Sequence, residues 1–405
     1  MDHPTAETSI GPLIAAVAIM LTLQITISMS VLSGPVLIEL AAPELGVAVH
    51  SIGYFLSIIF VFATFSSLMC GSFIGRFGPV RVIQGCLLLT AGALGLASSG
   101  DPWAVAIAGP VVGLAMGPTT PAATQLLGKL SPPRHRGLIF SLNQSGVPIG
   151  NALAGAILPS LGLLLGWQAP LLVMAGLCLA LVLAAQTQRR RLDLDLGNTG
   201  ALFSLRAIAE PMRVILRTPP LLRASLTSGG YAGMQACVSA FLVAIMIQRA
   251  GFDLVTAGVV LTVAQIAGAL GRVLWGFITD RTGRPALMLS VVGVLMTIFA
   301  ILIGAVEQDW PLALILLCAA ILGGTGIGWN GVYLAEVARL SPPGRVGSII
   351  GATSMYTFSG VLVVPSLFSL IVGQTGSYQM GFLFAALLSA AGALLCLPQA
   401  FKRVE

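Results

Sequence analysis

The chain has 405 residues, of which 57% are hydrophobic and only 8% are charged, and its formal net charge is +6. A soluble domain carries about 25% charged residues because water must wet its surface, so this composition excludes an ordinary soluble protein. The positive charge does not indicate a nucleic-acid partner, because the basic residues are confined to short segments between apolar runs. Most of the outer surface is therefore expected to face lipid.

Apolar segments long enough to span a bilayer recur along the chain. A spanning helix needs about 20 apolar residues, and helices suit these long runs because they pair every backbone polar group within the segment. The first segment lacks the basic residues that precede a signal peptide's apolar core, so we expect it to be retained. In chain order, we predict an all-α membrane protein with helices at 11–38, 47–70, 80–99, 103–127, 137–159, 166–186, 221–248, 255–278, 286–306, 311–335, 346–372 and 378–398.

The placement of the basic residues predicts the orientation in the membrane. Eighteen of the 20 Lys and Arg residues fall on one side of the predicted helices, and the opposite loops hold only Arg249 among their acidic residues. Lys and Arg are enriched in cytoplasmic loops, so both termini and the central loop are expected in the cytoplasm, with the chain crossing the bacterial inner membrane.

A polar segment at 187–220 divides the chain into two parts of similar length. It contains RRRLDLDLGNTG, followed by a mixed stretch that we expect to form an amphipathic helix along the membrane surface rather than a binding module. The predicted organisation is an N-terminal six-helix bundle at 1–186, a cytoplasmic linker at 187–220 and a C-terminal six-helix bundle at 221–405.

Two loop sequences repeat between the halves. LGKLSPPRHRG at 127–137 aligns with VARLSPPGRVG at 337–347, and GSFIGRFGPVR at 71–81 aligns with GFITDRTGRPA at 276–286. Both pairs fall at equivalent positions, after the second and the fourth helix of each half. A duplicated six-helix unit in parallel arrangement is typical of one large class of secondary transporters.

With these loops the chain resembles the major facilitator superfamily over essentially its whole length. The family's loop after helices 2 and 8 reads roughly G-x-x-x-D-R-x-G-R. The resemblance implies two pseudo-symmetric six-helix bundles that move a small-molecule substrate by alternating access, without enzymatic activity. The second copy of the motif is close to the family pattern, with Gly276, Asp280, Arg281, Gly283 and Arg284.

The acid of this loop implies a latch between the two halves. By resemblance, Asp280 should approach the start of the fifth helix near Gly137, where a helix N-terminus favours a carboxylate by about 0.3–1 kcal/mol. The first copy has Gly75 where the acid is expected, so the equivalent latch should be weakened. We assign gating roles to Asp280, Arg281, Arg284, Arg76 and Glu336, although simple pairing with Arg339 is the plainer role for Glu336.

A narrower likeness lies in the eighth helix. GALGRVLWGFITDR, which contains Arg272, is similar to helix 8 of monocarboxylate and oxalate–formate type carriers, in which the arginine pairs with the substrate carboxylate. The chain departs from these carriers elsewhere, because its eleventh helix has no lysine and its first helix lacks their acidic Gly-Trp signature. The resemblance therefore points to an organic anion without specifying one.

Arg272 is the ionisable residue placed deepest inside a predicted span. A charge at the centre of a membrane helix costs about 2.5–3.5 kcal/mol, so it needs a partner or water. Its spacing puts Gln265, Gly268 and Arg272 on one helix face. Snorkelling and structural pairing remain alternatives to contact with a substrate anion. A guanidinium binds a carboxylate through two hydrogen bonds but stays charged, so it cannot carry a coupling proton.

Other polar residues inside the spans are candidates to line a substrate cavity. Buried amides and hydroxyls need hydrogen-bond partners, which a ligand or a neighbouring helix can supply. The resemblance places helices 1, 4, 7 and 10 along the pathway. Together with Arg272 and Gln265, the candidate substrate-binding residues are Gln24, Gln144, Tyr231, Gln235, Asn330 and Tyr333.

Several other functions are disfavoured. G-x-G-x-x-G occurs at 326–331 but inside an apolar helix rather than after a strand, which argues against a dinucleotide site. The sequence has no Walker A motif and no cluster of metal ligands, and its six cysteines sit singly in apolar segments. We expect no cofactor, metal or nucleic-acid partner, and a monomer in contact with membrane lipid, with either the substrate's own proton or a counter-anion providing coupling. The alternatives are an exporter of hydrophobic or drug-like compounds and, less favoured, a non-transporting membrane sensor.

Overall fold

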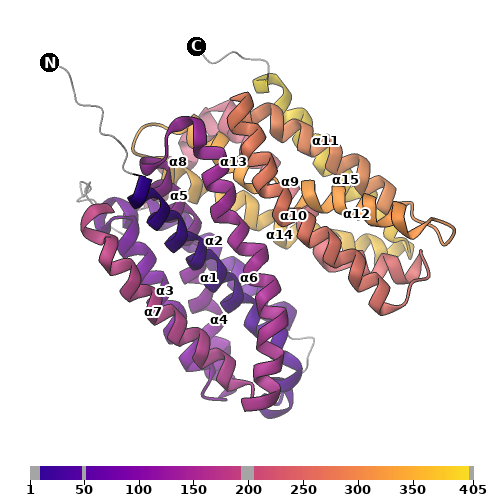
Figure 1. Ribbon diagram of the computed structural model, residues 1–405, viewed down its shortest axis with the longest axis horizontal. Coiled ribbons are helices and arrows are strands. Elements are labelled where there is room, and N and C mark those ends of the chain that lie inside the picture. The colour runs from indigo at the N-terminus through magenta and orange to yellow at the C-terminus, as the bar shows by residue number, and fades with distance from the viewer. Residues whose placement is uncertain (1–9, 48–51, 193–204, 401–405) are drawn as a thin grey trace.

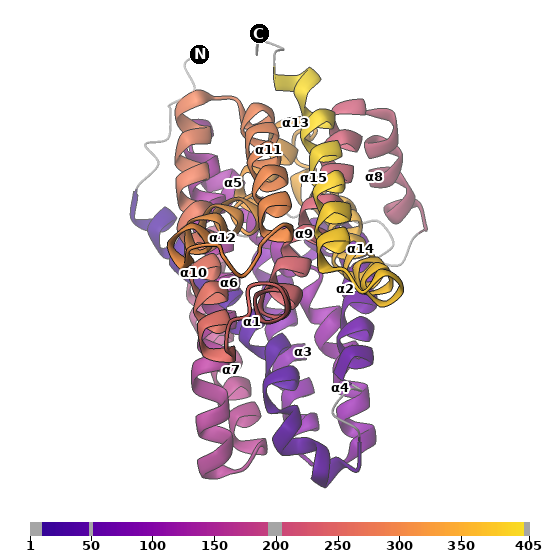
Figure 2. The same ribbon diagram turned by 90° about the vertical axis from the view of Figure 1, so that its right-hand side faces the viewer.

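The computed structural model describes residues 10–47, 52–192 and 205–400, and twelve spans in them are long and apolar enough to cross a membrane. The helices of these residues are shown in Figures 1 and 2. Their bounds are α1 (Ile10–Leu45), α2 (Ile52–Phe77), α3 (Pro79–Ala97), α4 (Pro102–Met116), α5 (Thr119–Leu130), α6 (Arg136–Leu165), α7 (Gln168–Leu192), α8 (Leu205–Arg217), α9 (Pro219–Gln248), α10 (Leu254–Thr282), α11 (Pro285–Gly304), α12 (Leu312–Gly326), α13 (Asn330–Leu340), α14 (Val346–Thr375) and α15 (Tyr378–Ala400).

These helices form two bundles of six spans each, as the sequence predicts. Helices α1–α7 make the N-terminal bundle and α9–α15 the C-terminal bundle, with α4 and α5 together, and α12 and α13 together, forming one span in each. The start of α1 and the end of α15 lie at the same end of the molecule, which we call the termini end, and the bundles lean apart away from it (Figure 1). Between the bundles, α2 packs against α14 and α6 against α10.

Two spans that the sequence predicts as continuous are broken. Predicted helix 103–127 is interrupted between α4 and α5, and predicted helix 311–335 is interrupted between α12 and α13. The first break follows from Gly117 and Pro118, because proline cannot donate the backbone hydrogen bond that a helix requires. The second falls at Ile327–Trp329, inside the G-x-G-x-x-G sequence. The prediction of two uninterrupted helices is therefore wrong at equivalent positions of the two halves.

The segment between the bundles contains the amphipathic helix that the sequence predicts. Helix α8 lies at the termini end (Figure 2) and packs against α9 and α14. Its Ile215 is fully buried, and Glu210 pairs with Arg345 at 2.7 Å. Residues 193–204 lie outside the described part of the chain, and α7 extends to Leu192, so the limits of the linker stay a prediction.

Candidate functional site

The guanidinium of Arg272 is sealed between the two bundles. Arg272 is only 1% exposed. Its guanidinium donates hydrogen bonds to the carbonyl of Ile327, at 2.9 Å, and to that of Gln144. Both acceptors are irregular points of the backbone. Ile327 lies in the break between α12 and α13, and the residue four positions after Gln144 is Pro148, which has no N–H to donate. Arg272 therefore satisfies carbonyls that the helices leave available.

A chain of amide side chains crosses the interface next to this arginine. The amide nitrogen of Gln24 on α1 donates to Oε1 of Gln144 on α6 at 2.9 Å and to the Thr120 hydroxyl at 3.1 Å. Gln144 in turn donates to Oδ1 of Asn330 on α13 at 3.0 Å. The fold thus brings four of the predicted substrate-binding residues, Arg272 among them, into one polar layer.

The positive charge in this layer has no negative partner in the part of the chain that the structure describes. Arg272 forms no ion pair with a carboxylate of residues 10–47, 52–192 or 205–400, and its two hydrogen bonds use two of its five N–H groups. Burying an uncompensated charge is costly, so such a group favours a site for a counter-ion. In this conformation the guanidinium is closed off from the surrounding medium, and Arg272 lines neither of two cavities found within the N-terminal bundle.

The remaining predicted substrate-binding residues lie within the C-terminal bundle. Tyr231 is fully buried and donates to the Leu289 carbonyl of α11 at 2.9 Å, so its hydroxyl is directed away from the interface. Gln235 accepts a hydrogen bond from the indole of Trp329 at 3.1 Å, and Gln265 donates to the Ser239 hydroxyl at 3.3 Å.

The Tyr333 hydroxyl is buried without a hydrogen bond of normal length in the described residues, although the hydroxyls of Thr353, Ser228 and Thr357 lie close to it. The residue is 3% exposed, and its ring packs against that of Trp329, with ring centroids 5.5 Å apart. An unsatisfied buried hydroxyl is unfavourable, and a ligand or a rearrangement can supply the missing partner. Tyr333 therefore lies beside a cluster of hydroxyl groups on α9 and α14.

Asp280 lies where the resemblance predicts it. Its two carboxylate oxygens accept hydrogen bonds from the backbone N–H groups of Gly137, at 2.8 Å, and Leu138, at 2.7 Å, in the first turn of α6. A Cβ at position 137 would lie 2.7 Å from Asp280 Oδ1, so the absence of a side chain permits this approach. The carboxylate of the C-terminal bundle therefore caps a helix of the N-terminal bundle.

The start of α14, which is the repeat equivalent of the start of α6, is capped by Gln125, a residue that the sequence analysis did not single out. Oε1 of Gln125, on α5, accepts a hydrogen bond from the backbone N–H of Gly347 in the first turn of α14, at 3.0 Å. Gly347 is the repeat equivalent of Gly137. Gln125 therefore accepts the backbone hydrogen bond that a carboxylate at position 75 would be expected to accept. The sequence signal was present: Gln125 is a polar residue one turn before the repeated LSPP loop.

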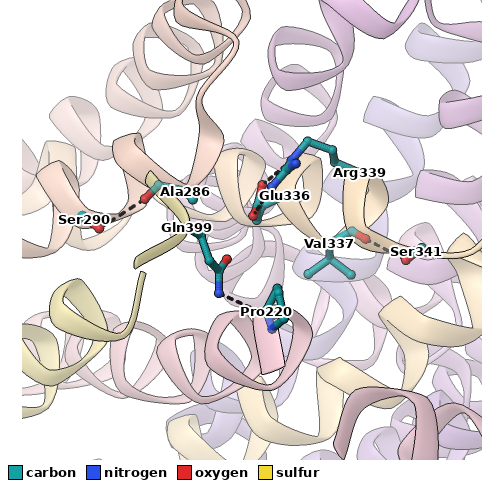
Figure 3. A network of polar contacts seen from close by, with 8 residues as sticks. All are labelled: Pro220, Ala286, Ser290, Glu336, Val337, Arg339, Ser341 and Gln399. Atoms are coloured by element: carbon teal, nitrogen blue, oxygen red, sulfur yellow. Dashed lines mark hydrogen bonds and ion pairs between the residues drawn. The ribbon is translucent and has the colours of Figure 1, made fainter. Parts of the chain in front are cut away.

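The other predicted gating residues surround these contacts at the termini end. Glu336 has no exposed side-chain area and binds Arg339 through two hydrogen bonds of 2.7 and 2.8 Å, as Figure 3 shows. The Arg76 and Arg281 guanidinium groups lie 5.8 and 4.9 Å from the ring centroids of Phe77 and Phe277. Arg284 is the residue immediately before α11.

The hydrogen bonds between the bundles lie toward one end of the molecule, and the contact of Phe60 with Phe358 lies farther from it. In the described residues, each hydrogen bond that joins the bundles lies in the half nearer the termini; further examples are Ser67 to the Gly351 carbonyl at 2.9 Å and Cys70 to the Gly347 carbonyl at 3.6 Å. At the opposite end of α6, Leu163 is 74% exposed. The structure is therefore a conformation closed at the termini end.

This architecture, with polar side chains gathered between two pseudo-symmetric six-helix bundles, defines a polytopic membrane transporter. The chain belongs to the Major Facilitator Superfamily, whose family model matches residues 14–365. The protein is thus a transporter of a small-molecule substrate and not an enzyme.

Individual relatives and a solved structure agree with this family. The chain is 23% identical to the hexuronate transporter of Bacillus subtilis (strain 168), over 70% of this chain and 69% of the relative. It is 24% identical to the probable galactarate/D-glucarate transporter GudP of Escherichia coli (strain K12), over 73% and 71%. A shorter match, 28% identical over 32% of this chain and 31% of the relative, is to the multidrug resistance protein MdtG of Proteus mirabilis (strain HI4320). The crystal structure of the transporter FucP in the outward conformation shares the fold, with a TM-score of 0.79 at 14% identity over 96% of this chain and 100% of that chain.

Proposed function

We propose that this transporter moves a small organic anion, a carboxylate, across the bacterial inner membrane by alternating access. The observation that carries the proposal is Arg272, a buried cation between the bundles that has no carboxylate partner in the described residues. An anionic substrate supplies the missing charge and can accept two parallel hydrogen bonds from the guanidinium.

The hydrogen-bond partners of Arg272 are expected to differ between the conformation closed at the termini end and the conformation open there. The excess of Lys and Arg at the termini end supports a cytoplasmic position for that end, and with this orientation we propose that the structure is an outward-facing state. Arg272 belongs to the C-terminal bundle and Gln144 to the N-terminal bundle, so their hydrogen bond must break when the cytoplasmic side opens. We infer that the guanidinium exchanges the Gln144 carbonyl for the substrate carboxylate during the cycle.

The neighbouring amides and the relatives narrow the substrate class. Gln24, Gln144 and Asn330 offer donors and acceptors that suit hydroxyl groups of a substrate. Relatives named for hexuronate and for galactarate and D-glucarate are transporters of hydroxylated carboxylates. A sugar acid would use both the guanidinium and the amides of this polar layer.

The chemistry of Arg272 limits how transport can be coupled to a proton or an ion. A guanidinium does not release its proton at physiological pH, so a proton must travel on another group or on the substrate itself. Glu336 is a buried carboxylate, but it is already bound to Arg339. We therefore propose that the substrate carries its own proton or exchanges with a counter-anion.

The test is uptake into proteoliposomes and substrate-induced thermal stabilisation with a panel of hexuronate, galactarate, D-glucarate and simple mono- and dicarboxylates. Arg272→Gln should reduce uptake of the preferred anion at least about 30-fold, because it removes a charged partner from a buried pair. Arg272→Lys should retain weaker stabilisation, since it keeps the charge but not the fork of donors. Arg213→Gln, at an exposed position on α8, is the matched control.

Full-rate anion uptake by Arg272→Gln would remove the assigned role of this residue. Absence of any anion transport by the unmodified protein would remove the proposed function itself. The partial match to MdtG favours one second candidate, export of drug-like compounds. Dye efflux from the same proteoliposomes, without carboxylate transport, would support that alternative.

A further inference from the structure

A groove of about 760 Å³ lies in the N-terminal bundle between the termini-end parts of α2 and α3. Leu114 of α4 and Pro118, which immediately precedes α5, also contribute to its lining. The rest is formed mainly by apolar residues of α2 and α3, including Phe65 and Leu89. The substrate layer around Arg272 is not part of this groove.

The groove opens sideways and has the depth of one membrane leaflet. Phe65 and Leu89 are 51% and 47% exposed, so this apolar lining faces the surrounding medium rather than the protein interior. Phe65 lies eleven residues before Arg76 on the same helix, which corresponds to about 16 Å along the helix axis. That distance is about half of the roughly 30 Å hydrocarbon thickness of a bilayer.

Two arginines line the groove where it reaches the membrane surface. Arg76 is in the last turn of α2 and Arg81 in the first turn of α3, and both are exposed. Neither pairs with a carboxylate within residues 10–47, 52–192 and 205–400. The position before Arg76 is Gly75, whereas the repeat-equivalent Asp280 supplies a negative charge beside Arg281. The mouth of the groove therefore carries two positive charges.

We infer that this groove binds an anionic phospholipid of the leaflet at the termini end. The phosphate would lie between Arg76 and Arg81, because guanidinium groups bind phosphate oxygens through paired hydrogen bonds. An acyl chain would follow the apolar wall from Phe73 toward Phe65 and Leu89. Basic pockets between membrane helices on the cytoplasmic side suit anionic headgroups for the same reason.

The experiment is native mass spectrometry of the full-length protein with equal amounts of phosphatidylglycerol and phosphatidylcholine. The intact protein should retain phosphatidylglycerol preferentially, and the double variant Arg76→Gln/Arg81→Gln should lose about 20-fold in that retention. The variant Arg213→Gln/Arg217→Gln removes the same charge from exposed positions on α8 and should keep it.

A second variant tests the apolar part without changing charge. Gly85 lines the groove, and a Cβ built there meets nothing within 4 Å, so Gly85→Phe should fold and occupy the acyl-chain space. It should lower phosphatidylglycerol retention while leaving the arginines in place. Equal retention of the two lipids, or unchanged phosphatidylglycerol retention in both groove variants, would overturn the inference. Displacement of the lipid by millimolar inorganic phosphate would show a phosphate site without an acyl-chain site and would also overturn it.

Discussion

The last turns of α2 and α10 are repeat equivalents, yet the helix starts near them in the opposite bundle are bound by different chemistry. In the last turn of α10, Asp280 accepts two backbone hydrogen bonds from the start of α6. In the last turn of α2, Gly75 has no side chain, and Gln125 of α5 instead accepts one hydrogen bond from the start of α14. A similar helix–helix junction is thus built with a carboxylate on one side and a neutral amide on the other.

This difference shows that two junctions related by a sequence repeat need not be equally stable. Hydrogen bonds to charged groups contribute about 1.5–3 kcal/mol, whereas neutral ones contribute about 0.5–1.5 kcal/mol. A carboxylate also gains from the helix N-terminus to which it binds. We therefore expect the contact of Gln125 with the start of α14 to open before the contact of Asp280 with the start of α6. Because Gly75 stands where the family pattern has an acid, Arg76 and Arg81 have no acidic residue next to them in the sequence. Both are therefore available for a lipid phosphate.

The largest expected effect comes from Asp280→Ala, because it removes both charged hydrogen bonds. We expect a shift of about 3 kcal/mol, or about 100-fold in population, away from the conformation closed at the termini end. The measurement is the distance distribution between spin labels on Leu163 and Gln374, at the far ends of α6 and α14, after replacement of the six buried native cysteines. Asp309→Ala, at an exposed position of the same far end, is the control. An unchanged distribution in Asp280→Ala would refute the latch.

Gly347→Val should have the next largest effect. A Cβ at this position collides with Oε1 of Gln125 and comes within 3.1 Å of Ile74, so the α2–α14 junction must separate or repack. Overpacking of this kind costs about 1–3 kcal/mol. The same spin-label pair should report a longer-lived state open at the termini end. Gly373→Val on the same helix, where a Cβ meets nothing within 4 Å, should leave the distribution unaltered.

Gln125→Leu should produce a smaller shift, of about 1 kcal/mol, because one neutral hydrogen bond is lost. The Gly347 N–H then has no acceptor from α5, while the shape of the side chain is largely kept. Spin-label distances should move in the same direction as in Asp280→Ala but by less. A shift equal to or larger than that of Asp280→Ala would contradict the proposed order of the two junctions.

The smallest effect, and the most direct test of the comparison, is expected from Gly75→Asp. It restores the acid of the family pattern, and a carboxylate near the start of α14 contributes about 0.3–1 kcal/mol. In the Gln125→Leu background it should recover part of the closed population. It should also reduce phosphatidylglycerol retention in the native protein, because the new charge lies beside Arg76. Recovery of neither property would show that the two loops are not functionally equivalent.

Much of the fold was predictable from local sequence. The length and apolar character of the spans identify all twelve, because the bilayer imposes a fixed helix length. The loop repeat identifies the two bundles and the contact of Asp280 with the start of α6, since that motif lies in one short segment. The breaks at Pro118 and Ile327 were missed, although the glycines and proline that cause them are visible in the sequence.

The composition and the loop motifs by themselves determined that this is a membrane transporter with two equivalent halves and a cation inside one span. Only the tertiary structure decided what surrounds that cation: carbonyls left available by Pro148 and by the break near Ile327, and an amide chain from Gln24 to Asn330. It alone also assigned Gln125 to the second junction. The physical reason is that such pairings join residues more than a hundred positions apart, and hydrophobic periodicity records the burial of a side chain but not the identity of its partner.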